Sequence, residues 1–371
     1  MINMLSRSDK SLVARWWWSI DKPLFKKIIL LMFVGILISI TAPNYNNEKV
    51  VGITTSINKK YLLFVLLGIT TFLFFSFLNI KWIKRIAIFG GFALIITLIL
   101  MQFIGIEKKG AIRWIQIFGF SVQPTEFVKP IFATFSALLF SAQYKNLKIP
   151  GIAMSFGLFI TFAILFIIQP DMGQTILLTA IWVGQLFVVG LSIQGVLYIM
   201  LLVIVGIITA YLFMPHFQSR IDSWIMPDKN DTYQVDKSLQ SFADGGWLSF
   251  KWGSGTNKYK IPDANTDFIF AVIGEEGGIL FCILLITLFT FIINAMLKQV
   301  RKQDDLFIML AILGIAIQFA LQTAINISST IGLIPAKGMT LPLISAGGSS
   351  YIGISMGLGL IIALTRRRDI A

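Results

Sequence analysis

The sequence predicts an all-α polytopic membrane protein, and three observations carry that prediction. Hydrophobic residue types make up 56% of the 371 residues and charged types only 13%, whereas a soluble globular chain carries about 25% charged residues. The mean hydropathy is +0.81. Apolar residues also occur in runs such as Lys60–Asn79 and Phe307–Asn326, which at about 20 residues are long enough to cross hydrocarbon as helices. Alternating period-two segments are absent, which argues against a β-barrel.

Ten transmembrane helices are expected where apolar runs lie between charged or Pro/Gly-rich breaks. Basic residues gather at both chain ends and at the junctions after helices two, four and eight, and the positive-inside rule assigns these junctions to the cytoplasm. We therefore expect a single integral membrane domain over residues 1–371, with both termini cytoplasmic. The helices should span about 24–42, 61–79, 86–105, 125–143, 149–168, 174–191, 194–214, 268–296, 305–327 and 349–365.

The longest predicted loop, about 215–266, joins helices seven and eight on the extracytoplasmic (periplasmic) side. It contains Pro, Gly, Asp, Lys and the tryptophans Trp224, Trp247 and Trp252. Such a segment is too polar to cross a membrane and too long to be a mere connector. We expect it to form part of an outward-facing working surface.

The net charge of +13 would suggest a nucleic-acid partner in a soluble protein. Here the basic residues lie near helix ends, where they meet anionic lipid headgroups, so we expect no nucleic-acid binding. Cys282 is the only cysteine, which excludes an internal disulfide and a thiolate metal cluster. The lone histidine, His216, cannot make a catalytic triad or a zinc site with the residues present.

Ionisable residues at or inside membrane helices are costly, so each is a candidate functional residue. Four clusters qualify, all on the predicted outer side. The first holds Arg113 and then Glu126 and Lys129, one turn apart at the start of helix four; an anion site fits, and so does a local Glu–Lys pair with a snorkelling lysine. In the second, Asp171 fits either a functional carboxylate or the N-cap of helix six.

The third cluster lies where the long loop enters helix eight. Asn265 or Thr266 can cap that helix, which places Asp267 at the mouth of a membrane cavity. Glu275 and Glu276 follow within the same predicted helix, about 12 Å deeper at 1.5 Å per residue. Capping explains Asp267 but not two adjacent carboxylates in an otherwise apolar span.

The fourth cluster precedes helix ten and combines two prolines, several glycines and three serines around Lys337, Ser345 and Ser349. An irregular segment at membrane depth is tolerated only where it lines a cavity. The start of helix ten at Gly347–Ser350 would offer free backbone N–H groups to an anion beside Lys337. A flexible loop is the alternative.

At these clusters the sequence resembles the SEDS family (shape, elongation, division and sporulation), ten-helix bacterial membrane proteins that polymerise peptidoglycan strands from lipid II. The resemblance covers essentially the whole chain and is closer to the division-type FtsW branch than to the elongation-type RodA branch. The family's essential aspartate falls on Asp267, whereas Asn265 replaces the histidine that members commonly have. The segments that carry the resemblance are SVQPTEFVKP, QPDMGQ, IPDANTDFIFAVIGEEGG and GLIPAKGMTLPLISAGGSS.

The resemblance implies a peptidoglycan glycosyltransferase in the bacterial cytoplasmic (inner) membrane. The 4-hydroxyl of one lipid-linked disaccharide would attack the anomeric carbon of a polyprenyl-pyrophosphate-linked chain, with Asp267 as the base. A divalent cation such as Mg²⁺ or Mn²⁺ could share the work, although no ligand set is readable. Substrate-binding candidates are Arg113, Glu126, Lys129, Lys337, Ser345 and Ser349, and supporting candidates are Asp171, Glu275 and Glu276.

The implied partners are lipid II, a class B penicillin-binding transpeptidase and other membrane proteins of division or elongation. Two other functions stay open. A lipid II flippase would also use a cationic cavity and broken helices, but it should show paired breaks at matching points of two half-repeats; only one break, near Ser345, is visible in the sequence. A non-catalytic scaffold would have no need of carboxylates inside helix eight.

Overall fold

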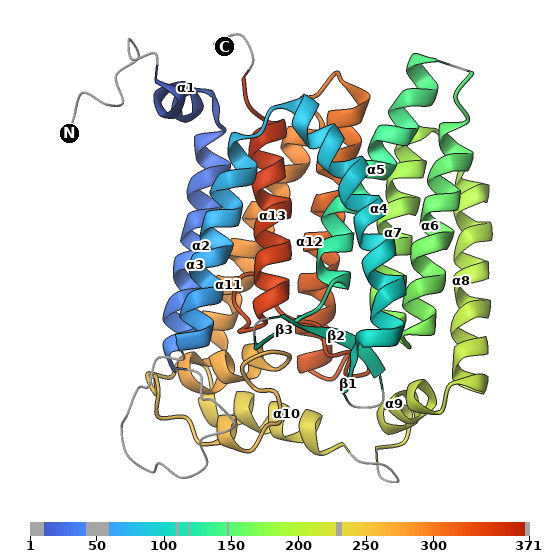
Figure 1. The fold of residues 1–371 in the computed structure, drawn as a ribbon. Coiled ribbons are helices and arrows are strands. Elements are labelled where there is room, and N and C mark those ends of the chain that lie inside the picture. The colour runs from blue at the N-terminus through green and yellow to red at the C-terminus, as the bar shows by residue number, and fades with distance from the viewer. Residues whose placement is uncertain are drawn as a thin grey trace.

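The computed structural model describes residues 11–41, 59–108, 111–117, 119–146, 148–227 and 232–367. Each of the ten predicted ranges contains one long helix, and these helices form an upright bundle (Figure 1). Six of them (α4, α6, α7, α8, α11 and α12) are long and apolar enough to cross a membrane. The ten are α2 (Lys22–Thr41), α3 (Lys59–Phe77), α4 (Ile80–Ile104), α5 (Thr125–Lys145), α6 (Gly151–Ile168), α7 (Met172–Val189), α8 (Ile193–Phe213), α11 (Ile269–Val300), α12 (Leu306–Thr330) and α13 (Gly348–Leu364).

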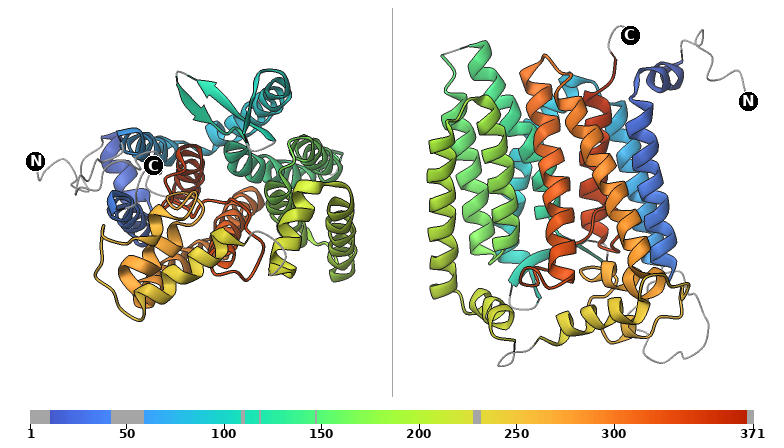
Figure 2. Two further views of the ribbon diagram at one scale, coloured as in Figure 1. Left: turned by 90° about the horizontal axis from the view of Figure 1, so that it is seen from below. Right: turned by 180° about the vertical axis from the view of Figure 1, so that it is seen from behind.

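All four predicted clusters lie at one end of the bundle, called here the loop end. The short helices α9 (Pro215–Ile225) and α10 (Tyr233–Gly245) cover this end, and the non-helical segment 331–347 returns there (Figures 1 and 2). The N-terminal helix α1 (Leu12–Ser19) and the C-terminal end of α13 lie at the opposite end. The structure therefore brings together segments that are more than 200 residues apart in the sequence, in agreement with the prediction that all four clusters lie on one side.

The core of the bundle is formed by α5, α12 and α13, whose side chains are mostly buried. Small residues allow the close packing of α3 on α13: a Cβ atom at Gly68 would lie 2.3 Å from the ring of Tyr351. By contrast, α8 stands at the margin of the bundle (Figure 2), and Ala210 is its one buried residue. The wall of the bundle on that side is thin.

The all-α prediction missed a small antiparallel sheet at the loop end. Its strands, in the order β1-β2-β3, are Ile106–Lys108, Ala111–Ile117 and Phe120–Val122. The longest strand, Ala111–Ile117, does not alternate between apolar and polar residues, and its burial pattern does not alternate either. No period-two signal in the sequence therefore marked this strand.

The structure also corrects the predicted eighth helix. At Gly278 the backbone has φ 79° and ψ 177°, a conformation that is essentially restricted to glycine, so α11 is two helical sections joined at a break. Glu275 and Glu276 lie in the short first section. The predicted cap is also wrong: Phe268 occupies the N-cap position without a side-chain hydrogen bond.

The loop 215–266 contains more regular structure than its composition predicts. Besides α9 and α10 it forms a 3-10 turn, η3 (Asn257–Tyr259). Backbone hydrogen bonds attach the loop to the break in α11: Ile279 donates to the carbonyl of Gly246 (3.0 Å), and Ser249 donates to that of Gly277 (3.2 Å). The loop is thus built onto the bundle rather than tethered only at its two ends.

Candidate active site

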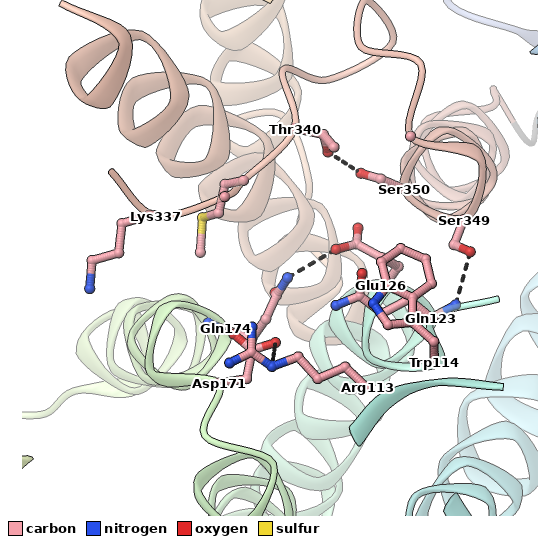
Figure 3. A pocket seen from close by; sticks show the side chains of 13 residues that line it. Arg113, Trp114, Gln123, Glu126, Asp171, Gln174, Lys337, Thr340, Ser349 and Ser350 are labelled. Atoms are coloured by element: carbon pink, nitrogen blue, oxygen red, sulfur yellow. Dashed lines mark hydrogen bonds and ion pairs between the residues drawn. The ribbon is translucent and has the colours of Figure 1, made fainter. Parts of the chain in front are cut away.

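Two adjoining cavities open at the loop end. The larger, of about 350 Å³, has mostly apolar walls from α7, α8, α9, α12 and the segment 334–339. The smaller, of about 60 Å³, is a polar recess against the starts of α5, α7 and α13 (Figure 3). The two share Arg113, Asp171, Lys337 and Met339 in their walls. An amphiphile with a long apolar part and a charged head matches this division of surfaces.

Three cations meet at the apolar cavity: Arg113, Arg220 and Lys337. Arg113 comes from β2 and its Nε donates to the carbonyl of Gln169 (3.0 Å), while its Nη2 donates to that of Pro170. Arg220 comes from α9 and its guanidinium donates to the carbonyl of Ala336 (3.4 Å). The Nζ of Lys337 lies 4.9 Å from the centre of the Phe217 ring.

Burial, followed by repulsion from Arg220, lowers the pKa of Lys337 below its ordinary value. Burial and repulsion from Arg113 likewise lower the pKa of Arg220. Positive charges that repel each other in a partly desolvated cavity are stabilised by a bound anion. Sequence analysis did not find Arg220; the only available signal was a basic residue in the amphipathic pattern of 215–225.

Asp171 contacts both a helix start and a cation. Its Oδ1 accepts from the backbone N–H of Gln174 (3.4 Å), so it is the N-cap of α7 as expected. Its Oδ2 also lies 3.8 Å from the Nε of Arg113. The same carboxylate therefore orients a cation at the cavity wall and begins a helix.

Glu126 and Lys129 form a buried ion pair with an Oε2–Nζ distance of 2.8 Å. Lys129 is fully buried, which excludes the snorkelling alternative, and its Nζ also donates to Gln322 (3.0 Å). Gln174 donates to the second oxygen of Glu126 (2.9 Å; Figure 3). Of the pair only Glu126 lines the recess, so Lys129 lies behind it rather than on the wall.

Asp267 lies in the turn before α11, half-buried, and its backbone N–H donates to the carbonyl of Asp263 (3.0 Å). A Cβ atom at Gly338 would lie 3.2 Å from its Oδ2, so the carboxylate lies directly beside the residue that follows Lys337. The negative charge of Asp267 also acts on Arg220, where it partly offsets the lowering of the Arg220 pKa. The structure thus brings the third and fourth clusters together next to the cations.

The serines of the fourth cluster have different positions. Ser349 lines the polar recess, and its Oγ accepts from the backbone N–H of Gln123 (2.9 Å; Figure 3). Ser345 instead donates to the carbonyl of Thr266 and accepts from the backbone N–H of Leu341. Ser345 therefore fastens the segment to the turn that carries Asp267. As predicted, α13 begins at Gly348, beside the recess.

Glu275 and Glu276 fasten the loop 246–260 onto α11. The carboxylate of Glu275 accepts from the backbone N–H groups of Thr256 (2.7 Å) and Asn257 (2.9 Å). Glu276 forms a buried ion pair with Lys258 at 2.6 Å. Like Asp267, neither glutamate is among the residues that line the two cavities; the contacts of the two glutamates are with the loop.

Within the described residues, no three His, Cys, Asp or Glu side chains gather at a spacing that would hold a metal ion.

Comparison with known proteins identifies the family. The model for FtsW, RodA and SpoVE, described as cell cycle proteins, matches residues 22–370. The chain belongs to this family. The resemblance to SEDS proteins is therefore confirmed, and with it a multi-pass membrane protein.

Curated relatives favour the FtsW branch. A "probable peptidoglycan glycosyltransferase FtsW" of Caulobacter vibrioides is 33% identical over 365 residues, 98% of this chain and 93% of the relative. A protein of the same name from Aliivibrio salmonicida is 30% identical and covers 93% and 88%. Stage V sporulation protein E of Bacillus subtilis is 29% identical and covers 83% and 86%.

Solved structures show the same fold. A chain from a peptidoglycan synthase complex that coordinates polymerization and crosslinking superposes with a TM-score of 0.79 at 22% identity, covering 95% of this chain and 99% of that chain. The rod shape determining protein RodA of Thermus thermophilus superposes with a TM-score of 0.66 at 21% identity, covering 94% and 97%.

Proposed function

We propose that this chain is a peptidoglycan glycosyltransferase that polymerises glycan strands from lipid II. One observation carries the proposal: an apolar cavity ends at three cations, Arg113, Arg220 and Lys337, and the Asp267 carboxylate lies beside Gly338, the residue that follows Lys337. A polyprenyl chain suits the apolar wall, and a pyrophosphate suits the cations. The names of the relatives agree with this activity.

In the proposed reaction, the 4-hydroxyl oxygen of the acceptor sugar attacks the anomeric carbon of the donor. Asp267 takes the hydroxyl proton as the new glycosidic bond forms. The bond between the anomeric carbon and the pyrophosphate oxygen breaks, and the lipid-linked pyrophosphate leaves with the electron pair. Arg113, Arg220 and Lys337 stabilise the charge that develops on this leaving group.

The other site residues support this arrangement. Glu126 and Ser349 line the recess beside the start of α13, where backbone N–H groups favour a negative charge. Lys129 forms a buried ion pair with Glu126, and Asp171 orients Arg113. Ser345 fixes the segment 331–347, and the two glutamates of α11 fix the long loop.

The proposal includes a membrane topology. All ten long helices cross the bacterial cytoplasmic (inner) membrane as a single domain over 1–371, both termini are cytoplasmic, and the loop 215–266 is periplasmic. Support comes from the common loop end of the four clusters (Figure 1) and from the basic residues at the opposite junctions, such as Lys84 and Lys145.

The proposed partner is a class B penicillin-binding transpeptidase, together with other membrane proteins of division or elongation. A polymerase that makes uncrosslinked strands leaves crosslinking to a second enzyme, and a protein of the same fold comes from a complex that coordinates the two steps. Mild solubilisation of native membranes should recover a transpeptidase with this chain; repeated recovery of the chain alone would count against the partnership.

A lipid II flippase is the second candidate. The structure adds a break at Gly278 to the irregular segment before α13, but both lie in the second half of the chain, not at matching points of two halves. Glu275 and Glu276 hold a loop, so these two carboxylates do not exclude a scaffold. The apolar cavity and its three cations are now the observation that favours an enzyme over a scaffold.

The test is polymerisation of lipid II by the purified protein, with and without transpeptidase, compared with Asp267→Asn and Asp263→Asn. Asp263 is a matched control in the same turn; its φ is 58°, which asparagine tolerates. Asp267→Asn should fold normally and lose about 10²-fold or more of the rate, the scale of general-base removal. Asp263→Asn should stay close to wild type.

Two results would contradict the proposal. Glycan synthesis by Asp267→Asn within a few-fold of wild type at equal protein level would remove Asp267 from the mechanism. Transfer of lipid II across vesicles without any polymer, by wild-type protein with its partner present, would favour the flippase.

A further inference from the structure

Asn326 connects two parts of the candidate site. It lies near the end of α12 and is fully buried. Its Nδ2 donates to the carbonyl oxygen of Asp267 itself (2.9 Å) and to that of Met339 (2.6 Å). Because a carbonyl oxygen only accepts hydrogen bonds, the amide nitrogen must face both groups, which fixes the orientation of the side chain.

The two carbonyls belong to segments that carry the proposed chemistry. Asp267 is the proposed base, and Met339 follows Lys337 and Gly338 at the cavity wall. Further hydrogen bonds join the same segments, from Ser345 to Thr266 and from the backbone N–H of Ala346 to the carbonyl of Asn265 (2.8 Å). Asn326 differs from these contacts because it comes from a third element, a buried helix of the core.

The Asn326 side chain is not arranged for stability alone. Its Oδ1 is buried without a hydrogen-bond partner among the described residues, and an unsatisfied buried acceptor is unfavourable. An apolar residue of the same shape would avoid that cost but would leave both carbonyls without their donor. The role of Asn326 is therefore to fix positions: its side-chain amide holds the backbone carbonyls of Asp267 and Met339 at a constant distance from each other.

We infer that Asn326 is a positioning residue for glycosyl transfer, holding the Asp267 carboxylate in register with the cation at Lys337. The inference rests on the proposed function. General-base catalysis needs the carboxylate within hydrogen-bond reach of the hydroxyl, while the leaving group is held by residues of another segment. A shift of either segment moves the base relative to the residues that hold the leaving group, without removing any group that contacts the substrate.

The experiment compares Asn326→Leu and Asn326→Asp with wild type and with Gln318→Leu. Gln318 is a matched control because it is a buried amide on the same helix, about two turns away. The readouts are kcat and KM for lipid II, with the thermal unfolding midpoint of each variant. Asn326→Asp keeps the shape and, when protonated, one donor, so it is informative even if Asn326→Leu fails to fold.

We expect Asn326→Leu to lower kcat by about 10- to 100-fold, the scale of a small misplacement of catalytic groups. KM should stay within about twofold, because no substrate contact is lost. Asn326→Asp should give a smaller fall in kcat, and Gln318→Leu should resemble wild type.

Three results would overturn the inference: wild-type kcat in the Asn326 variants, a rise in KM that accounts for the loss, or an equal loss in Gln318→Leu. A wild-type protein that makes no glycan would overturn the proposed function as well. An active wild type with unaffected Asn326 variants would overturn this inference alone.

Discussion

The charged residues at the loop end are of two kinds: some are paired with an opposite charge within the protein, and others face a cavity that a ligand can enter. Lys129 is fully buried and its charge is matched by Glu126, whereas Lys337 and Arg220 lie at a cavity wall and repel each other. The first kind of residue mainly supports the structure. The second kind has a charge that a ligand can match.

Lys129→Met should therefore act first on stability. Removing one partner of a buried pair leaves an uncompensated charge and costs about 3–5 kcal/mol. The double variant Glu126→Gln/Lys129→Met removes both charges and should recover much of that loss. Thermal unfolding in detergent checks whether the double variant is more stable than Lys129→Met. If Lys129→Met is as stable as wild type, the ion pair contributes little to stability.

Lys337 should give a pH dependence to donor binding. Because its pKa is lowered, the ammonium is charged below that pKa and loses its proton as pH rises, earlier than an ordinary lysine. Affinity for a polyprenyl pyrophosphate should fall over that range. Lys337→Arg stays charged and should remove this fall, so parallel pH profiles of affinity for the two proteins would contradict the assignment.

At the scale of elements, the break in α11 determines what the long loop can do. The first section, Ile269 to Gly277, turns away from the rest of the helix at Gly278, and the loop 246–260 is hydrogen-bonded to both sides of the break. Asp267 lies two residues before this section. The conformation of Gly278 therefore acts on the proposed base through this short section, in addition to the hydrogen bonds that fix its turn.

Gly278→Ala tests that dependence. A Cβ atom there would lie 2.8 Å from the Cα of Leu248, and the backbone conformation costs about 1–3 kcal/mol for other residues. We expect lower thermal stability and faster trypsin cleavage near Lys251. Gly206→Ala in α8 is the control, since nothing lies within 4 Å of its Cβ; a similar loss in both variants would contradict the role of the break.

The elements that could be predicted from the sequence are those determined by residues close together in the chain. Apolar runs marked all ten long helices, and the place of Asp171 between two runs allowed an N-cap as one of its two predicted roles. The break at Gly278, the sheet around Arg113 and the partners of Glu275 depend on contacts with distant segments. Arg220 was missed for the same reason, because it reaches the site only through the packing of α9 against 334–337.

At the scale of the whole molecule, the segments that carry the four clusters share one end of the bundle, and the junctions α3–α4, α5–α6 and α11–α12 lie at the other (Figure 1). Because these junctions are basic, the positive-inside rule supports the proposed orientation. In that orientation the proposed reaction would take place on the side of the membrane away from the cytoplasm.

Cysteine labelling in intact cells tests this orientation. Asn146→Cys lies at the exposed end of α5, and Gln240→Cys lies on α10 at the loop end; Asn230, in the same long loop, lies outside the described residues. A membrane-impermeant maleimide should label position 240 and not 146. Cys282 is buried and serves as the unlabelled background, and labelling of both positions from one side would refute the topology.

The thin wall at α8 has a thermodynamic consequence for the proposed substrate. Ile207 of α8 lines the apolar cavity, and Ala210 is the one buried residue of this helix, so α8 lies between that cavity and the margin of the bundle. If a polyprenyl tail passes from the bilayer to the cavity, it exchanges one hydrocarbon environment for another, and the gain of about 0.8 kcal/mol per CH₂ that accompanies transfer out of water does not arise. For the proposed substrate we therefore expect the binding free energy to come mainly from the charged head and the sugar, and the length of the tail to contribute little.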